Sequence, residues 1–196
     1  MPGLKDGLAL ISHGAVTSAG AALALHALDA WLDRQFVVTA LSLEGYAANL
    51  AIQDPHLAAA RPAPGQAAAA DRLREPLTSK ATPDAARNLQ DALCFRLAAP
   101  VLGAARAALD AAIQNVEIEI NGTTTSPIVL VQDGHILSTP NFHAPTLTLA
   151  LDAAAGALAH VAVSGALRVC KLLTARFSGL PAYLSPVGGG SASYVS

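Results

Sequence analysis

The sequence predicts a mainly α-helical protein, an elongated helical bundle that carries one small β-hairpin. Three long stretches repeat apolar residues at the three- to four-residue spacing of an amphipathic helix. One short stretch, centred on Asp133-Gly134, has a turn dipeptide typical of hairpins. Residues 177–196 are rich in glycine, proline and serine and lack this periodicity. We therefore expect one helical domain over residues 1–176 and a C-terminal tail or arm over 177–196.

The first two predicted helices follow each other closely. Apolar residues recur at helical spacing through residues 8–32, interrupted by Gly14 and Gly20, which indicates one long helix or two helices broken at the glycines. A further helix is predicted over residues 36–52. It should stop just before Pro55, because a proline ring disfavours the α conformation in the residue that precedes it.

The second half of the chain contains two more long helices with the hairpin between them. Residues 83–114 show helical periodicity, with a kink or a local break expected at Pro100, and residues 144–176 show it again. Strands are predicted at 127–131 and 135–138, on either side of the turn, so that the hairpin covers about 127–138. The shorter predictions are a surface connection over 61–66, a short helix over 67–74, a polar loop over 76–83 and an alternating, strand-like stretch over 116–120.

The composition excludes some functions and favours an oligomer. The net charge of −2 and the absence of any lysine or arginine run exclude nucleic acid as a partner. The chain is 53% hydrophobic and only 13% charged, whereas a soluble surface normally needs about a quarter charged residues. We therefore expect much of the surface to be buried between subunits of a homodimer or homotetramer.

The cysteines and the N-terminus favour the cytoplasm. Cys94 and Cys170 are far apart and fit neither a CxxC motif nor a disulfide scaffold, so we expect two reduced thiols. The first residues lack the charged and apolar regions of a secretion signal. Residues 146–173 are apolar enough to span a bilayer, but they contain four polar or ionisable groups, Asp152, His160, Arg168 and Lys171, so a buried bundle helix is the preferred interpretation and no membrane association is expected. No metal site is expected, because ligand spacing is lacking at the lone histidines His26, His56, His135 and His160.

Five short segments occur in an informative order along the chain. They are Lys5-Asp6-Gly7-Leu8-Ala9-Leu10, Arg61-Pro62-Ala63-Pro64-Gly65-Gln66, Gln90-Asp91, Glu119-Ile120-Asn121 and Asn141-Phe142-His143. Together they resemble the histidine and phenylalanine ammonia-lyase family. The resemblance implies the central part of the ammonia-lyase fold and a tetrameric helical core. It also implies a methylidene-imidazolone cofactor, made from an Ala-Ser-Gly tripeptide upstream of this region. These 196 residues contain no such tripeptide, so we expect a shortened, divergent homologue without a cofactor.

The first family position with chemical interest follows Leu10. An ungapped comparison puts Ser12-His13-Gly14 where the family has Asn-Gly-Thr, whose asparagine helps to position the cofactor and the substrate. Ser12 and His13 are therefore candidate catalytic residues, since an unperturbed imidazole titrates near neutral pH and can act as a base. The alternative is a helix cap or a hydrogen-bonded loop at a helix interruption.

The second family position covers residues 90–96. The family's Gln-Asp-x-Tyr-Ser-x-Arg run carries a proton-transfer tyrosine and an arginine that binds the substrate carboxylate. Here the arginine is kept as Arg96, while Leu93 replaces the tyrosine and has no proton to exchange. Gln90 and Arg96 are candidate substrate-binding residues. Arg96 would bind an anionic ligand or form a structural pair with a carboxylate such as Asp91 or Glu119.

Two further candidates complete the predicted site. Cys94, beside the lost tyrosine, is a candidate nucleophile, and the alternative for it is a small buried apolar side chain. Asn141 and Phe142 are candidate substrate-binding residues, because the resemblance implies that this phenylalanine reaches an active site built by several subunits. The family's Asp and Asn after Glu119-Ile120-Asn121 are lost, which suggests that only the backbone architecture is kept there.

Three functions remain open from the sequence. The first is an enzyme whose intersubunit cavity has been reused for a cofactor-independent lyase, isomerase or cyclase step on an acidic small molecule. The second is one subunit of a split aromatic amino acid ammonia-lyase or aminomutase, with a lyase-like partner chain. The third is a noncatalytic small-molecule-binding or scaffold protein.

Overall fold

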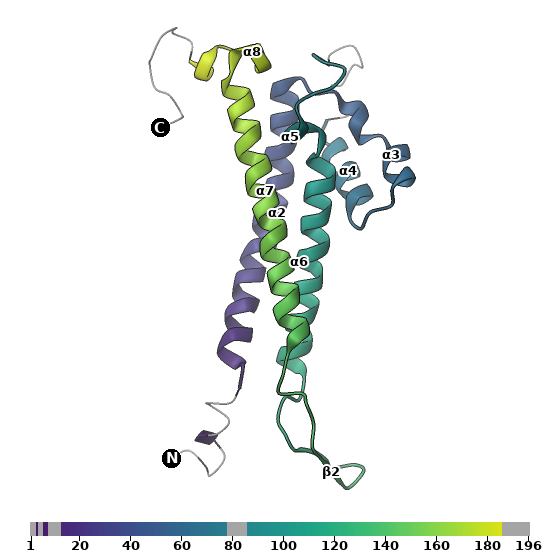
Figure 1. The fold of residues 1–196 in the computed structure, drawn as a ribbon, viewed down its shortest axis with the longest axis vertical. Helices are drawn as coiled ribbons and strands as arrows, with labels where there is room; N and C mark the ends of the chain where they lie inside the picture. Colours follow the sequence, from purple (N-terminus) through teal and green to yellow (C-terminus); the bar gives the residue numbers. More distant parts are fainter. Residues whose placement is uncertain (1–2, 4–5, 8–12, 78–85, 186–196) are drawn as a thin grey trace. The chain divides into compact units, whose positions relative to one another are not determined.

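A computed structural model describes residues 3, 6–7, 13–77 and 86–185 of the chain (Figure 1). The chain divides into two compact units. Unit 1 comprises Met1–Ala30 and Ala108–Ala154, and unit 2 comprises Trp31–Ala107 and Ala155–Ser196. The three long helices α2, α6 and α7 each contribute to both units. The predicted mainly α class with one small hairpin is confirmed.

The described elements follow one another in a simple order, with the hairpin between α6 and α7 (Figure 1). They are α2 (Ala15–Tyr46), η1 (Leu50–Gln53), α3 (Pro55–Ala60), α4 (Gln66–Arg74), α5 (Leu93–Arg96), α6 (Ala98–Asn121), β1 (Ile128–Leu130), β2 (His135–Leu137), α7 (Pro145–Leu173), α8 (Ala175–Ser178) and η3 (Ala182–Leu184).

The first long helix is continuous. α2 runs through Gly20 and joins the two stretches that the sequence left separate. It ends at Tyr46, earlier than predicted, because Ala47 adopts a left-handed conformation with φ of 53°. The residues before Pro55 form the 3₁₀ helix η1 in place of the predicted α-helix, and Asp54 is extended (φ −62°, ψ 131°), as expected for a residue that precedes proline.

The predicted helix over 83–114 is wrong in its first part. The described residues 86–92 are not helical, and the helical chain is then broken once more at Leu97, between α5 and α6. The break at Leu97 agrees with the local break expected near Pro100, which lies in the first turn of α6, where its missing N–H has no intrahelical partner to lose.

A buried carboxylate explains the irregular segment before α5. Asp91 is 5% exposed, and its Oδ2 accepts a hydrogen bond from the Asn49 amide at 2.6 Å. Its Oδ1 accepts a second bond from Asn88 Nδ2 at 3.3 Å. A charged acceptor strengthens such bonds, so the segment is fixed to the chain just after α2 and cannot continue as a helix.

The strand-like stretch over 116–120 is also wrong, since these residues form the last turns of α6. Val116 is buried at 3% exposure, and packing of this kind outweighs a short alternation in the sequence. The hairpin has the predicted turn: β1 and β2 pair antiparallel with Ile128 opposite Leu137, and Gly134 has φ of 67°.

Each unit has its own apolar core. Unit 1 buries Leu25 of α2, Leu109 of α6 and Leu147 of α7. In unit 2 the rings of Tyr46 and Phe95 stack with centroids 3.9 Å apart, so the end of α2 packs against α5. This stacking places the residues next to Phe95, including Arg96, on a well-packed support.

Two of the described helices, α2 and α7, are long and apolar enough to cross a membrane by length and composition. A core helix of a soluble protein passes the same test. The expectation that residues 146–173 form a bundle helix and not a membrane span therefore stays a prediction.

Candidate functional site

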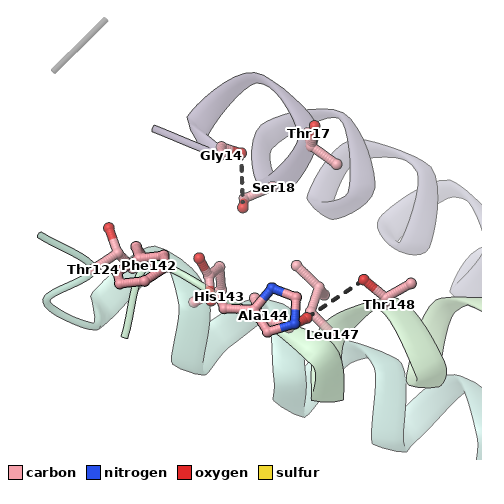
Figure 2. A pocket seen from close by; sticks show the side chains of 10 residues that line it. Gly14, Thr17, Ser18, Thr124, Phe142, His143, Ala144, Leu147 and Thr148 are labelled. Atoms are coloured by element: carbon pink, nitrogen blue, oxygen red, sulfur yellow. Dashed lines mark hydrogen bonds between the residues drawn. The ribbon is translucent and has the colours of Figure 1, made fainter. Parts of the chain in front are cut away.

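The first pocket lies within unit 1 and has a volume of about 210 Å³. Figure 2 shows Gly14, Thr17 and Ser18 on the α2 side of this pocket and residues from the start of α7 on the other. Its lining residues are Gly14, Thr17, Ser18, Glu119, Thr124, Phe142, His143, Ala144, Leu147 and Thr148. Three segments that are far apart in the sequence thus meet at one small pocket.

Two hydroxyl groups that line the unit 1 pocket donate hydrogen bonds to carbonyls at the start of their own helices. Ser18 Oγ donates to the carbonyl of Gly14 at 3.1 Å, and Thr148 Oγ1 donates to the carbonyl of Ala144 at 3.4 Å (Figure 2). Each carbonyl also accepts the amide of the same residue, so the hydroxyl donors of Ser18 and Thr148 are already used within their own helices. Neither helix carries an acidic residue in its first turn.

Two residues predicted from the sequence are connected to the loop at residues 123–124. His13 Nδ1 lies 3.3 Å from Thr124 Oγ1, and Asn141 Nδ2 donates to the carbonyl of Thr123 at 3.3 Å. Phe142 lines the pocket itself, with 68% of its surface exposed. Ser12, the remaining candidate from this region, lies outside the described residues.

The structure also adds two residues that the sequence did not single out for chemistry. The side chains of His143 and Glu119 both line the unit 1 pocket. An imidazole and a carboxylate are the usual proton-transfer groups of enzymes. Their signal was present in the Glu-Ile-Asn and Asn-Phe-His segments, but nothing in the spacing showed that they meet.

The second pocket lies within unit 2 and has a volume of about 230 Å³. Most of its lining is apolar, with Arg96 and Asp54 as the charged residues. The lining residues are Ile52, Asp54, Leu57, Ala58, Gln66, Ala70, Leu93, Arg96, Leu97, Ala99 and Pro100. The pocket therefore offers one guanidinium within a largely hydrophobic lining.

Arg96 is half-buried, and among the described residues its guanidinium makes no ion pair and no hydrogen bond. The structural pair with Asp91 is not formed, because both carboxylate oxygens of Asp91 are bonded to Asn49 and Asn88. Glu119 belongs to the lining of the unit 1 pocket. A half-buried arginine without an ion pair among the described residues is suited to binding an anionic ligand.

The other charged group of the unit 2 pocket is already engaged. Asp54 caps α3, because its Oδ1 accepts a hydrogen bond from the His56 amide at 2.8 Å. The same oxygen lies 2.7 Å from His56 Nδ1. These bonds, the backbone one first, hold the pKa of Asp54 below its usual value of 3.8. Asp54 is thus an ionised cap at neutral pH.

The remaining predicted residues lie outside both described pockets. Gln90 is exposed and lines neither of them. Cys94 is 7% exposed, and burial raises the pKa of its thiol despite the nearby charge of Arg168. A raised pKa lowers the fraction of thiolate, which is the nucleophilic form. Cys170 is a free, exposed cysteine on α7.

A model of the aromatic amino acid lyase family matches residues 1–195. The chain belongs to the aromatic amino acid lyase family. The predicted relationship to the histidine and phenylalanine ammonia-lyases is thereby confirmed. Family membership explains why the Lys5 to Leu10, Gln90-Asp91 and Asn141 to His143 segments occur in their observed order.

The curated relatives of the chain include histidine ammonia-lyases. The chain is 34% identical to the enzyme of Symbiobacterium thermophilum over 188 residues, which is 94% of this chain and 37% of the relative. It is 35% identical to that of Stigmatella aurantiaca over 189 residues, with the same two shares. The chain therefore spans little more than a third of the length of these relatives.

Solved structures support the same fold. Ergothionase from Treponema denticola, solved with desmethyl-ergothioneine sulfonic acid, superposes with a TM-score of 0.86 at 26% identity, over 98% of this chain and 39% of that one. Histidine ammonia-lyase from Trypanosoma cruzi superposes with a TM-score of 0.80 at 30% identity, over 94% and 34%. The predicted ammonia-lyase-like helical fold is confirmed.

Proposed function

We propose that this chain binds an acidic small molecule through Arg96 and takes part in a lyase, isomerase or cyclase step on it. The observation that carries the proposal is the guanidinium of Arg96, which has no partner among the described residues, at a largely apolar pocket of about 230 Å³. The apolar walls, which include Leu57, Leu93 and Leu97, suit a ring or a short hydrocarbon. The guanidinium suits a carboxylate or sulfonate, which it can bind through two parallel hydrogen bonds.

The unit 1 pocket, taken by itself, is a separate candidate place for proton transfer, independent of the binding proposed at Arg96. His143 and Glu119 line it, and His13 lies within hydrogen-bond reach of Thr124 at its edge. Either the imidazole or the carboxylate can take a proton from a bound molecule, and such general-base help is typically worth about 10²–10⁴-fold in rate. Ser12 and Cys94 remain candidate participants, as do Asn141 and Phe142 on the binding side.

The proposal does not use the family's electrophilic cofactor, the methylidene-imidazolone, as a group of this chain. A methylidene-imidazolone makes an amino group a better leaving group when it is present, and it forms from an Ala-Ser-Gly tripeptide. The 196 residues printed here contain no such tripeptide, so we derive no step through this group. A partner lyase-like chain that carries it is the split-enzyme alternative.

The substrate class follows from the relatives and from the pocket together. The relatives are named for histidine, and the ergothionase ligand is a sulfonic acid. Both compounds contain an acidic group that a guanidinium binds. We therefore propose an acidic molecule with a small ring, and L-histidine is the first probe to test.

A self-assembling chain in the cytoplasm is part of the proposal. Long apolar side chains are exposed on all three long helices, for example Leu23 at 74%, Ile118 at 62% and Leu149 at 68%. Burial of such side chains between subunits would remove apolar surface from water, which favours association. Native mass spectrometry of the detergent-free protein should show a homodimer or homotetramer. A monomer, a membrane-bound form or a complex with a second lyase-like chain would each contradict this expectation.

Calorimetric titration tests the binding proposal directly. Wild-type protein should bind L-histidine at least about tenfold more tightly than L-histidinamide, which lacks the carboxylate, because a hydrogen bond to a charged group contributes about 1.5–3 kcal/mol. Arg96→Met should abolish that preference. Arg34→Met, which removes one exposed arginine from the same unit, should keep it. Equal affinities of wild-type protein for both compounds would refute Arg96 as an anion anchor for this substrate class.

A further inference from the structure

Unit 2 contains a second arginine whose surroundings are unusual. Arg168 of α7 is only 4% exposed. Its guanidinium donates to Ser164 Oγ at 3.0 Å, to Thr39 Oγ1 at 3.0 Å and to the carbonyl of Cys94 at 3.4 Å. Ser164 Oγ also donates to that carbonyl at 3.4 Å. The guanidinium thus joins α7, α2 and α5 in one hydrogen-bonded cluster.

Every acceptor in this cluster is a neutral group. No described carboxylate pairs with Arg168, and burial lowers the pKa of its guanidinium. Taking a charge out of water is costly unless it is paired, and apolar replacements for buried charges are often neutral or stabilising. Stability alone therefore gives little reason for an arginine at this position, so its contacts point to another role.

The carbonyl of Cys94 shows what that role is. It lies in the four-residue helix α5, directly before the break at Leu97, whose backbone (φ −91°, ψ 9°) separates α5 from α6. Carbonyls at a helix end lack intrahelical partners, and a cationic side chain can satisfy them. Arg168 and Ser164 provide this partner from α7. The turn held in this way ends at Arg96, which lines the unit 2 pocket.

We propose that Arg168 is a positioning residue that holds the α5 turn and thereby places the guanidinium of Arg96 at the unit 2 pocket. The ligand-binding part of this inference rests on the proposed function of Arg96. The other part, that Arg168 fixes the α5 turn, rests only on the hydrogen bonds of Arg168 to Cys94, Ser164 and Thr39. Two readouts therefore separate the two parts.

The main variant is Arg168→Met, which keeps an unbranched side chain of similar reach and removes the donors. Hydrogen exchange followed by mass spectrometry should show faster exchange of the amides of residues 95–98, by about tenfold or more, since the loss of hydrogen bonds to a charged donor is of that size. The same protein should lose its preference for L-histidine over L-histidinamide to within about twofold, as expected when an anchoring group moves by about an ångström. Its melting temperature should change little, because a costly buried charge is gone.

Two further variants keep the test decisive. Thr39→Val removes one acceptor with hardly any change in shape, so it should fold and show the same two effects in weaker form. It replaces Arg168→Met in the test if that variant does not fold. Arg168→Lys keeps a donor for Ser164 and the Cys94 carbonyl, so it should rescue part of the ligand preference. Arg34→Met serves again as the control and should match wild-type protein in both readouts.

Each outcome decides one part of the proposal. Unchanged exchange at residues 95–98 in Arg168→Met and in Thr39→Val would overturn the hold on α5. Faster exchange with an intact ligand preference would overturn the link from Arg168 to Arg96. If wild-type protein shows no preference for L-histidine, the proposed function fails, and the exchange data still decide whether Arg168 holds α5.

Discussion

The close approach of Gly65 to Gly103 gives the sharpest prediction about stability. Gly103 lies in α6, and the backbone of the loop that leads into α4 packs directly against it. A methyl group added at Gly103 would lie 2.6 Å from the carbonyl carbon of Gly65, 2.7 Å from its oxygen and 2.8 Å from the amide nitrogen of Gln66. An ordinary carbon–carbon contact begins near 3.5 Å, so the methyl group would be roughly 0.9 Å too close to the Gly65 carbon.

The backbone must move to accept this methyl group, because the atoms in the way are main-chain atoms and not a flexible side chain. Overpacking of this kind typically costs about 1–3 kcal/mol. The loop cannot relax freely, since Gly65 has φ of 76° and begins α4 as its N-cap residue. We therefore expect Gly103→Ala to lower the free energy of unfolding by about 2–3 kcal/mol, the upper part of that range. Gln66 lines the unit 2 pocket, so ligand affinity should fall as well.

Urea denaturation at one fixed protein concentration, followed by far-ultraviolet circular dichroism, measures this effect. Gly156→Ala is the matched control, because Gly156 lies inside α7 and a methyl group there meets nothing within 4 Å. Alanine has the higher helix propensity, so this control should gain about 0.5–1 kcal/mol. If Gly103→Ala is as stable as Gly156→Ala, the tight contact between α6 and the loop at Gly65 is refuted.

Two carboxylates give further predictions. Asp91→Asn should lower the free energy of unfolding by about 1–3 kcal/mol, because the half-buried Asn49 amide loses its charged acceptor. Asp133→Asn at the exposed hairpin turn should change it by less than about 0.5 kcal/mol, and equal urea midpoints for the two variants would contradict this. The pKa of Asp54 is lower in the folded chain than its ordinary value of 3.8, so its contribution to stability is complete above that value and is lost as the pH falls through the lower folded pKa. Asp54→Asn, which also removes the charge that faces His56, should flatten the dependence of the urea midpoint on pH in this acidic window, and an unchanged slope would exclude Asp54 as its source.

The helices that could be predicted from the sequence are those with uninterrupted apolar periodicity. The helix predicted over residues 144–176 forms as Pro145–Leu173, and the hairpin forms around Gly134 as expected. In both cases the determining information is local, either a long run of periodic residues or a turn dipeptide. Whether residues 8–32 form one helix or two broken at the glycines was left open, because a glycine inside a helix costs only about 1 kcal/mol and tertiary packing decides the outcome.

The parts that could not be predicted depend on contacts between residues far apart in the chain. Asp91 bonds to the amide of Asn49, and Arg168 bonds to the carbonyl of Cys94. No periodicity encodes either contact. In the sequence Arg168 counted only as a charge that argues against a membrane span, although a lone arginine within an apolar helix is itself a signal that some partner must be sought.

The candidate site shows the same division between local and distant information. The segments around His13, Arg96 and Phe142 could be singled out by family resemblance, and the structure places each of them at or beside a pocket. The participation of His143 and Glu119 in one lining could not be foreseen, because it depends on how the end of α6 meets the start of α7.

The hydrogen bonds of Asp91 and Arg168 determine which charge is left for a ligand in unit 2. Asp91 at its beginning and Arg168 behind Cys94 both bind neutral backbone groups, and neither forms an ion pair among the described residues. If Asp91 had paired with Arg96, the guanidinium would have been neutralised and the Asn49 amide would have lacked its acceptor. Because the Asn49 backbone amide and the Asn88 side chain occupy Asp91, the positive charge of Arg96 is left without a carboxylate partner in the described chain. An anion that enters the unit 2 pocket would then meet a guanidinium whose attraction no described carboxylate cancels.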